Sequence, residues 1–203
     1  GFVPQKGILF SGTIASNQRF GKADASDEQI KKAADIAQAS EFIETKNDGY
    51  ESSIAQGGSN VSGGQKQMLA IARAIAKDPH NYVFDDSFSA LDLKTDARLR
   101  AALAEVTENA SVIIVAQRIS TIIHADQILV LDAGKIVGKG THEELLKNCD
   151  VYMQIAQSQL SAKELGLDDK AAETATDKAA DNVTKTATDT SAVSGLDNEK
   201  EGM

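Results

Sequence analysis

The sequence contains one cysteine, two prolines and no tryptophan in 203 residues. The single cysteine, Cys149, excludes an intrachain disulfide and any metal site built from several cysteines, and it favours a reducing compartment. No apolar run approaches the ~20 residues that a membrane-spanning helix needs, and neither a signal peptide nor a basic arm is visible. Hydrophobic residues make up 41% of the chain, which is typical of a globular domain.

Negative charge dominates the composition and is unevenly distributed. The net charge is −9, which argues against sequence-independent binding to nucleic acid. Residues 161–203 hold ten acidic residues against five lysines, with no aromatic side chain and few large aliphatic ones. Such a segment cannot bury enough apolar surface to offset its ordering entropy. We therefore predict one folded domain at residues 1–160 and a disordered acidic tail at 161–203.

Within the folded part, apolar strand patterns alternate with helical ones. The strand signals are at residues 82–84 and 111–116, and the second is the strongest candidate for a buried strand. A hairpin is predicted from two further runs joined by a glycine turn, at 127–131 and 135–137. Helical periodicity or capping pairs predict helices at 26–39, 62–76, 95–107, just after 141, and at 151–160. This alternation indicates an α/β fold with a largely parallel sheet.

The segment Ser62-Gly63-Gly64-Gln65 opens one of these helices. A serine followed three residues later by glutamine is a capping-box pattern. The two glycines leave the backbone N–H groups of the first turn uncovered, and such groups attract anions. Taken alone, the segment is either an ordinary capped helix or a phosphate ligand.

A pair of aspartates, Asp85 and Asp86, follows the apolar run at 82–84. In parallel α/β sheets, ligands collect at the carboxyl ends of strands. A carboxylate at such an end is suited to hold Mg²⁺ beside nucleotide phosphates. The alternative is that Asp85 only caps a turn into the loop that follows.

The order of these motifs resembles the nucleotide-binding domain of ATP-binding cassette (ABC) exporters. The segment 62–65 is similar to the signature motif of that family, residues 82–86 to its Walker B strand and residues 89–92 to its D-loop. Further similar segments are the Q-loop with its exporter-type continuation at 3–14, the switch loop at 115–121 and the closing segment at 125–146. The resemblance covers about residues 1–158 and leaves the tail outside.

The resemblance implies a P-loop NTPase-like parallel sheet with a helical subdomain, and it also exposes an absence. No G-x-x-x-x-G-K-[ST] phosphate loop occurs in the sequence, although the family carries one before its Q-loop. The chain also begins within a strand pattern and without methionine. We therefore expect an N-terminal truncation, and we expect the fragment alone to bind ATP poorly and to be inactive.

The resemblance also implies roles for single residues in binding ATP and Mg²⁺. Gln5 would sense the γ-phosphate and Mg²⁺, and Asp85 would hold Mg²⁺. Two cassettes would pair head to tail, so that the signature motif contacts the nucleotide held by the partner chain. Ser89 and Asp92 would cross the interface of that dimer. The signature residues concerned are Ser62, Gly63, Gly64 and Gln65.

Two departures from the family affect the catalytic positions. Asp86 stands where hydrolysing sites usually carry glutamate as general base, and its side chain is one methylene shorter. Gln117 stands where the family usually has histidine, and an amide carries no titratable proton. Both changes resemble the degenerate half of heterodimeric exporters. The chain's own site is therefore expected to bind ATP without efficient turnover, while its intact signature motif completes the partner's site.

The leading hypothesis is thus the ATPase module of a heterodimeric exporter of drugs, lipids or peptides. It would associate with a transmembrane domain upstream of residue 1 and with a second half-transporter, at the cytoplasmic face of a bacterial plasma membrane, without nucleic acid. One alternative is a regulatory pseudo-ATPase that uses its nucleotide only as a clamp. Another is a soluble ABC ATPase of DNA repair or translation, which the exporter-type stretch at 9–14 disfavours.

Overall fold

The computed structural model describes residues 1–161 and 164–165, so the predicted acidic tail lies almost entirely outside the described residues. The chain divides into two compact units. The first comprises residues 1–129 with 139–142, and the second comprises 130–138 with the described residues from 143 onward. Each unit is described by itself below.

The first unit contains the predicted parallel sheet. Its strand order is β1-β4-β5, with every pair parallel, for β1 (Phe2–Val3), β4 (Asn81–Asp85) and β5 (Ser111–Val115). Val3 is paired with Phe84, and Phe84 with Ile114. This sheet confirms the α/β class, and it brings the carboxyl ends of all three strands to one edge.

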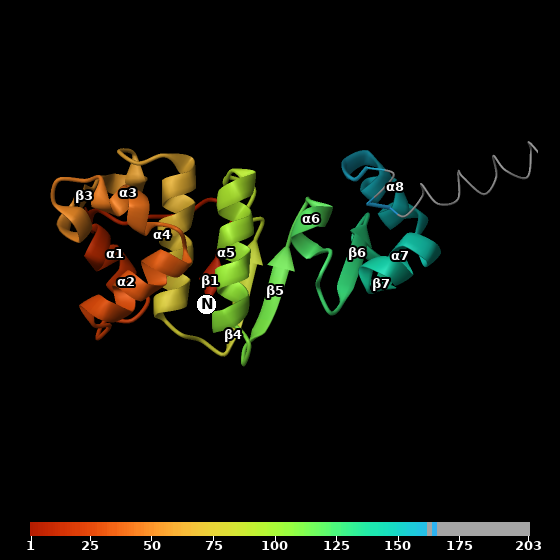
Figure 1. Cartoon of the computed structure of the whole chain (residues 1–203), viewed down its shortest axis with the longest axis horizontal. Coiled ribbons are helices and arrows are strands. Elements are labelled where there is room, and N and C mark those ends of the chain that lie inside the picture. The colour runs from red at the N-terminus through yellow and green to blue at the C-terminus, as the bar shows by residue number, and fades with distance from the viewer. Residues whose placement is uncertain (162–163, 166–203) are drawn as a thin grey trace, which may run out of the picture. The chain divides into compact units, whose positions relative to one another are not determined.

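One face of the sheet is packed against α4 (Gly63–Ala76) and α5 (Leu93–Val106). The buried cluster joins side chains of both helices to Val3, Tyr82 and Phe84. Helix α4 is buried on more than the single face that periodicity indicated, because α1 and α2 also pack on it. In Figure 1 the first turns of α4 and α5 and the last residues of β4 and β5 point toward the same, upper edge.

The opposite face of the sheet is open. Phe2 is 63% exposed, Ile113 58% and Val115 52%. The prediction that 111–116 forms a buried strand was therefore wrong about burial, although the strand itself is confirmed. The physical reason is that α4 and α5 cover the other face of the sheet, the one that carries Phe84 and Ile114, and no other element of the first unit covers Ile113.

A mainly helical part, residues 12–58, precedes α4 in the first unit, and its helices α1 and α2 pack on α4. It consists of three helices, two short 3₁₀ turns and a two-stranded antiparallel pair: α1 (Ile14–Arg19), α2 (Asp27–Ile36), α3 (Ser40–Glu44), η1 (Gly49–Glu51), η2 (Gln56–Gly58), β2 (Gly12–Thr13) and β3 (Ser53–Ile54). Helix α2 begins with the predicted capping box of Ser26 and Gln29. Helix α1 begins with a Thr13–Ser16 box, which sequence reasoning missed because its fourth residue is not Glu or Gln.

Four more elements end the described chain. They are β6 (Ile128–Asp132), β7 (Lys135–Gly140), α7 (His142–Asn148) and α8 (Asp150–Gln159). The β6–β7 hairpin turns through Ala133 and Gly134, both with positive φ, which is the type I′ geometry that suits a two-residue turn. None of the helices that the structure describes is both long and apolar enough to cross a bilayer.

Candidate functional site

Three loops that leave the parallel sheet meet at Asp86. Gln5 follows β1, Asp86 follows β4, and Gln117 follows β5. The side-chain amides of Gln5 and Gln117 both donate to the Oδ2 atom of Asp86, at 3.3 and 3.4 Å. Both distances exceed the ~2.9–3.0 Å of a typical N–H···O bond, so these hydrogen bonds are long. The structure thus brings three of the predicted site residues together.

The backbone at Asp86 turns the chain sharply out of the sheet. Its φ is 44°, in the left-handed region that non-glycine residues seldom occupy. The conformation is fixed from both sides, because its N–H donates to the carbonyl of Val115 at 2.8 Å and its own carbonyl accepts from the Ser89 hydroxyl at 2.9 Å. Backbone strain of this kind is often found at functional sites.

Ser89 connects this turn to the loop after β5. Its carbonyl accepts a hydrogen bond from the Arg118 guanidinium at 3.3 Å, and Arg118 is the immediate neighbour of Gln117. A small crevice lies beside these groups and is lined by Asp86, Phe88, Ser89, Val115, Ala116, Arg118 and Thr121. Arg118 was not among the predicted site residues, although its position next to Gln117 could have indicated it.

Asp85 is half-buried at the last position of β4 and forms no ion pair among the residues that the structure describes. The described residues contain no group of three or more His, Cys, Asp or Glu side chains that could hold a metal ion. A lone strand-end carboxylate suits Mg²⁺, which keeps several waters and takes few protein ligands when it binds with nucleotide phosphates.

The segment 62–65 forms the predicted capping box. The Gln65 amide donates to the Ser62 hydroxyl at 3.2 Å, and the Ser62 amide donates to the Gln65 side chain at 3.1 Å. The amides of Gly63 and Gly64 donate to no group among the described residues. Two uncovered N–H groups at the positive end of a 14-residue helix can bind an anion. No hydrogen bond joins this segment to Gln5 or Asp86 in the described part.

The two glycines differ in the space around them. A Cβ atom on Gly63 would meet no heavy atom within 4 Å, so this position faces open surface. A Cβ atom on Gly64 would lie 3.3 Å from the carbonyl oxygen of Ala90. The start of α4 therefore packs closely on the loop at 89–92 beside Gly64, whereas Gly63 faces open surface.

Asp92 caps the start of α5. Its Oδ1 accepts from the backbone amides of Lys94 and Thr95, at 3.1 and 3.0 Å, and its Oδ2 accepts from the Thr95 hydroxyl at 2.7 Å. The hydrogen bond from the Thr95 hydroxyl, followed by that from the Thr95 amide, lowers the pKa of the exposed Asp92 carboxyl. Both carboxylate oxygens are thus engaged within the chain.

This cap predicts an acid-sensitive contribution to stability. Because the folded-state pKa of Asp92 is lowered, the charged cap stabilises the fold above about pH 4, the ordinary pKa, and the contribution is lost as pH falls through the folded value. Asp92→Asn should keep the cap and flatten the dependence below about pH 4, whereas Asp92→Ala should lower stability most above about pH 4, where the charged cap is formed. Urea midpoints measured from about pH 3 to pH 7 test this, and equal slopes for wild type and Asp92→Asn would contradict it.

A buried ion pair supports the loop that carries Gln117. Asp96 on α5 is 1% exposed and accepts from Arg100 Nε at 3.1 Å. Arg100 Nη1 also donates to the carbonyl of Ser120 at 2.8 Å. Ser120 belongs to α6 (Ile119–Ile122), a single turn without a side-chain cap. The guanidinium therefore ties this short helix to α5.

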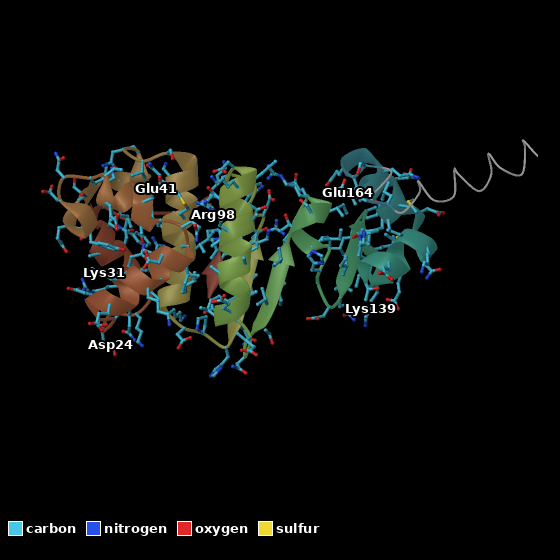
Figure 2. The ribbon with its side chains drawn as sticks, in the orientation of Figure 1. Asp24, Lys31, Glu41, Arg98, Lys139 and Glu164 are labelled. Atoms are coloured by element: carbon cyan, nitrogen blue, oxygen red, sulfur yellow. The ribbon has the colours of Figure 1, made fainter. Side chains whose placement is uncertain are left out.

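Removing Arg100 is expected to destabilise the fold. Arg100→Met leaves the Asp96 carboxylate buried without its charged partner, a change that costs about 3–5 kcal/mol in fully buried pairs. We expect about 2 kcal/mol here, since the Arg100 side chain is 28% exposed. Arg98→Met is the matched control, because Arg98 is exposed on the same helix (Figure 2). Urea unfolding measures both, and equal losses would contradict a specific role for the ion pair.

Comparison with known proteins places these features in a family. Residues 1–89 match the family model described as ABC transporter. An uncharacterised ABC transporter ATP-binding protein of Mycobacterium tuberculosis is 48% identical over 82% of this chain and 29% of its own length. ATP-binding cassette sub-family B member 6 of Xenopus tropicalis is 44% identical over 83% of this chain and 20% of its own length.

A solved structure described as a bacterial Atm1-family ABC exporter with ATP bound has a similar fold. The TM-score is 0.76 at 35% sequence identity, covering 79% of this chain and 28% of that one. The chain thus spans less than a third of the length of each protein that it matches here.

Proposed function

Because the chain belongs to the ABC transporter family, as an ATP-binding domain of the exporter type, we propose that residues 1–160 act as the cassette of a half-transporter. Members of this family bind and hydrolyse ATP. In the proposed protein, pairing of two cassettes around ATP drives a transmembrane domain, and the cassette works at the cytoplasmic face of the membrane. The coverage of under a third of each relative supports a longer working protein.

The observation that carries the proposal is the meeting of Gln5, Asp86 and Gln117 at the edge where the strands end. Asp85 and Gln5 would hold the Mg²⁺ that accompanies ATP, and Mg²⁺ would neutralise charge on the phosphates. Gln117 would donate a hydrogen bond to a phosphate oxygen. Asp86 would orient the attacking water, but its carboxylate is set back by one methylene compared with glutamate.

The chain's own site is therefore proposed to bind ATP and to hydrolyse it slowly. A positioned general base contributes about 10²–10⁴ to a rate, and both catalytic positions differ from the hydrolysing pattern. The amide of Gln117 donates to Asp86 but accepts no proton in the relevant pH range. Binding of ATP, in contrast, would need the phosphate loop of the longer working protein, which residues 1–203 do not contain, together with Gln5 and Asp85.

The signature segment is proposed to serve a second chain. The uncovered amides of Gly63 and Gly64, with the Ser62 hydroxyl, would contact the phosphates of ATP held by the partner. The open surface at Gly63 supports this, since no part of the described chain covers it. The partner is then a different half-transporter that carries efficient catalytic residues, which makes the assembly a heterodimer. Ser89 and Asp92 would face it.

Photolabelling of the reconstituted transporter tests the proposal. Both chains should be labelled by 8-azido-ATP with Mg²⁺, and vanadate, which traps the product of hydrolysis, should retain label mainly on the partner chain. Asp85→Asn should weaken labelling of this chain only. Vanadate trapping on neither chain would favour a regulatory clamp without hydrolysis. Absence of labelling on this chain would overturn the proposed site.

A further inference from the structure

The loop that presents Gln5 is attached to α4 by buried side chains that no catalytic role requires. Gln67 lies in the second turn of α4, is 1% exposed, and uses both ends of its amide. Its Oε1 accepts from the Gly7 amide at 2.9 Å, and its Nε2 donates to the Pro4 carbonyl at 3.2 Å. One side chain thus holds the backbone on both sides of Gln5.

Close packing between the loop and the helix depends on a residue without a side chain. A Cβ atom on Gly7 would lie 2.7 Å from the carbonyl oxygen of Lys66 and 2.9 Å from its carbonyl carbon. Both are backbone atoms of α4, which cannot move aside as a flexible side chain could. The approach that lets Gln67 reach the Gly7 amide therefore requires glycine at position 7.

A second attachment holds the end of the same loop. Arg73, further along α4, donates from Nη2 to the Ile8 carbonyl at 2.9 Å, and its guanidinium lies 5.3 Å from the centre of the Phe10 ring. Asn17 accepts from the Phe10 amide at 2.9 Å and donates to the Phe10 carbonyl at 2.8 Å. Burial lowers the pKa of the Arg73 guanidinium. The loop is thus bound at five backbone groups, three of them to α4 and two to α1.

We propose that Gln67 is the positioning residue for Gln5, and that it makes the Gln5 loop and α4 one rigid piece. The first turn of the same helix carries Ser62 and Gly63, which on the proposed function contact the partner's nucleotide. Any displacement of α4 when that nucleotide binds is therefore transmitted through Gln67 to Gln5 and to its contact with Asp86. The effect on nucleotide binding rests on the proposed function. The two hydrogen bonds between Gln67 and the Gln5 loop, called the Gln67 clamp below, can be tested without it.

The clamp is tested by hydrogen exchange in the whole chain. Gln67→Met keeps a similar volume and removes both hydrogen bonds, so exchange at the Gly7 amide should accelerate about tenfold or more. Gln18→Met is the matched control. Gln18 is also fully buried and donates to the Leu69 carbonyl of α4 at 3.2 Å, but no hydrogen bond joins its side chain to the Gln5 loop among the described residues. Equal acceleration at Gly7 in both variants, or none in Gln67→Met, would overturn the clamp.

Its functional meaning is tested by a double-mutant cycle in the complete transporter. The readout is the preference of this chain's site for ATP over ADP, measured by competition with 8-azido-ATP labelling, because Gln5 is proposed to sense the γ-phosphate. Gln5→Ala and Gln67→Met should each reduce the preference about tenfold, and the double variant should reduce it no further. Gln18→Met should leave it within about twofold.

The hydrogen-exchange experiment and the double-mutant cycle distinguish a failure of the positioning role from a failure of the proposed function. If the double variant reduces the preference for ATP over ADP by the product of the two single effects, Gln67 does not act through Gln5, and the positioning role is overturned. If this chain binds neither nucleotide in the complete transporter, the proposed function is wrong, while exchange at the Gly7 amide still decides whether the clamp exists.

Discussion

Replacing Asp86 with glutamate and Gln117 with histidine together is expected to raise ATP hydrolysis at this chain's own site by about 10²–10⁴-fold. Glutamate would extend the carboxylate by one methylene toward the water that it must activate. Histidine would replace the amide that now donates to Asp86 Oδ2 at 3.4 Å with a group whose proton can be exchanged near neutral pH. Both changes act at the point where the three loops meet.

The expected gain in hydrolysis rate, expressed as a free energy, is larger than the expected loss of folding stability. Position 86 has φ of 44°, and a longer side chain in the left-handed region costs about 1–2 kcal/mol. A 10²–10⁴-fold gain corresponds to about 3–5 kcal/mol of transition-state stabilisation. Two hydrogen bonds hold the backbone of residue 86, one from its amide to the Val115 carbonyl and one from the Ser89 hydroxyl to its own carbonyl. Neither involves the side chain of residue 86, so both remain after the substitution.

Site-resolved vanadate trapping in the heterodimer measures the result, because total ATPase activity is dominated by the partner's site. Each single variant should give less trapping on this chain than the double variant does. Asp86→Asn with Gln117→His is the matched control, since it provides the histidine without a carboxylate base. If the double variant traps no more label on this chain than wild type, the slow step lies elsewhere.

The sequence predicted much of this site because its signals are local. The capping box of Ser62 and Gln65 depends on four consecutive residues and is confirmed. The strand at 81–85 and its parallel neighbours could be predicted from apolar runs between helices. Their carboxyl ends must then share one edge, which is why Gln5, Asp86 and Gln117 could be expected near one another.

Features that depend on distant parts of the chain were missed. Gln67 looks like an ordinary polar residue within an apolar helix, and its role depends on a loop sixty residues earlier in the chain. The prediction of a buried strand at 111–116 failed for a related reason. Apolar residues on both faces of a strand indicate that both faces can be covered, but only the neighbouring elements decide whether they are. Here Ile113 is 58% exposed.

Gly63→Asp in this chain is expected to lower ATP hydrolysis at the partner's site by about 10²-fold or more, while leaving the chain itself as stable as before. A carboxylate at the first position of a helix is favourable by about 0.3–1 kcal/mol because of the helix dipole. A Cβ atom at position 63 meets nothing within 4 Å, so no steric cost offsets this. Folding therefore gives no reason for a loss.

The loss would come from the surface that Gly63 presents to the partner. A negative side chain beside two uncovered amides would occupy the space proposed for the γ-phosphate and repel it. Losing one preorganised donor to a transition-state oxyanion costs about 10²–10³ in rate. Gly63→Asn has nearly the same size without the charge, so a smaller loss in that control would assign the difference to electrostatic repulsion.

Vanadate trapping on the partner chain and urea unfolding of this chain give the two readouts. Unchanged trapping in Gly63→Asp would show that α4 does not face the partner's nucleotide, whereas a loss of both trapping and stability would trace the defect to folding.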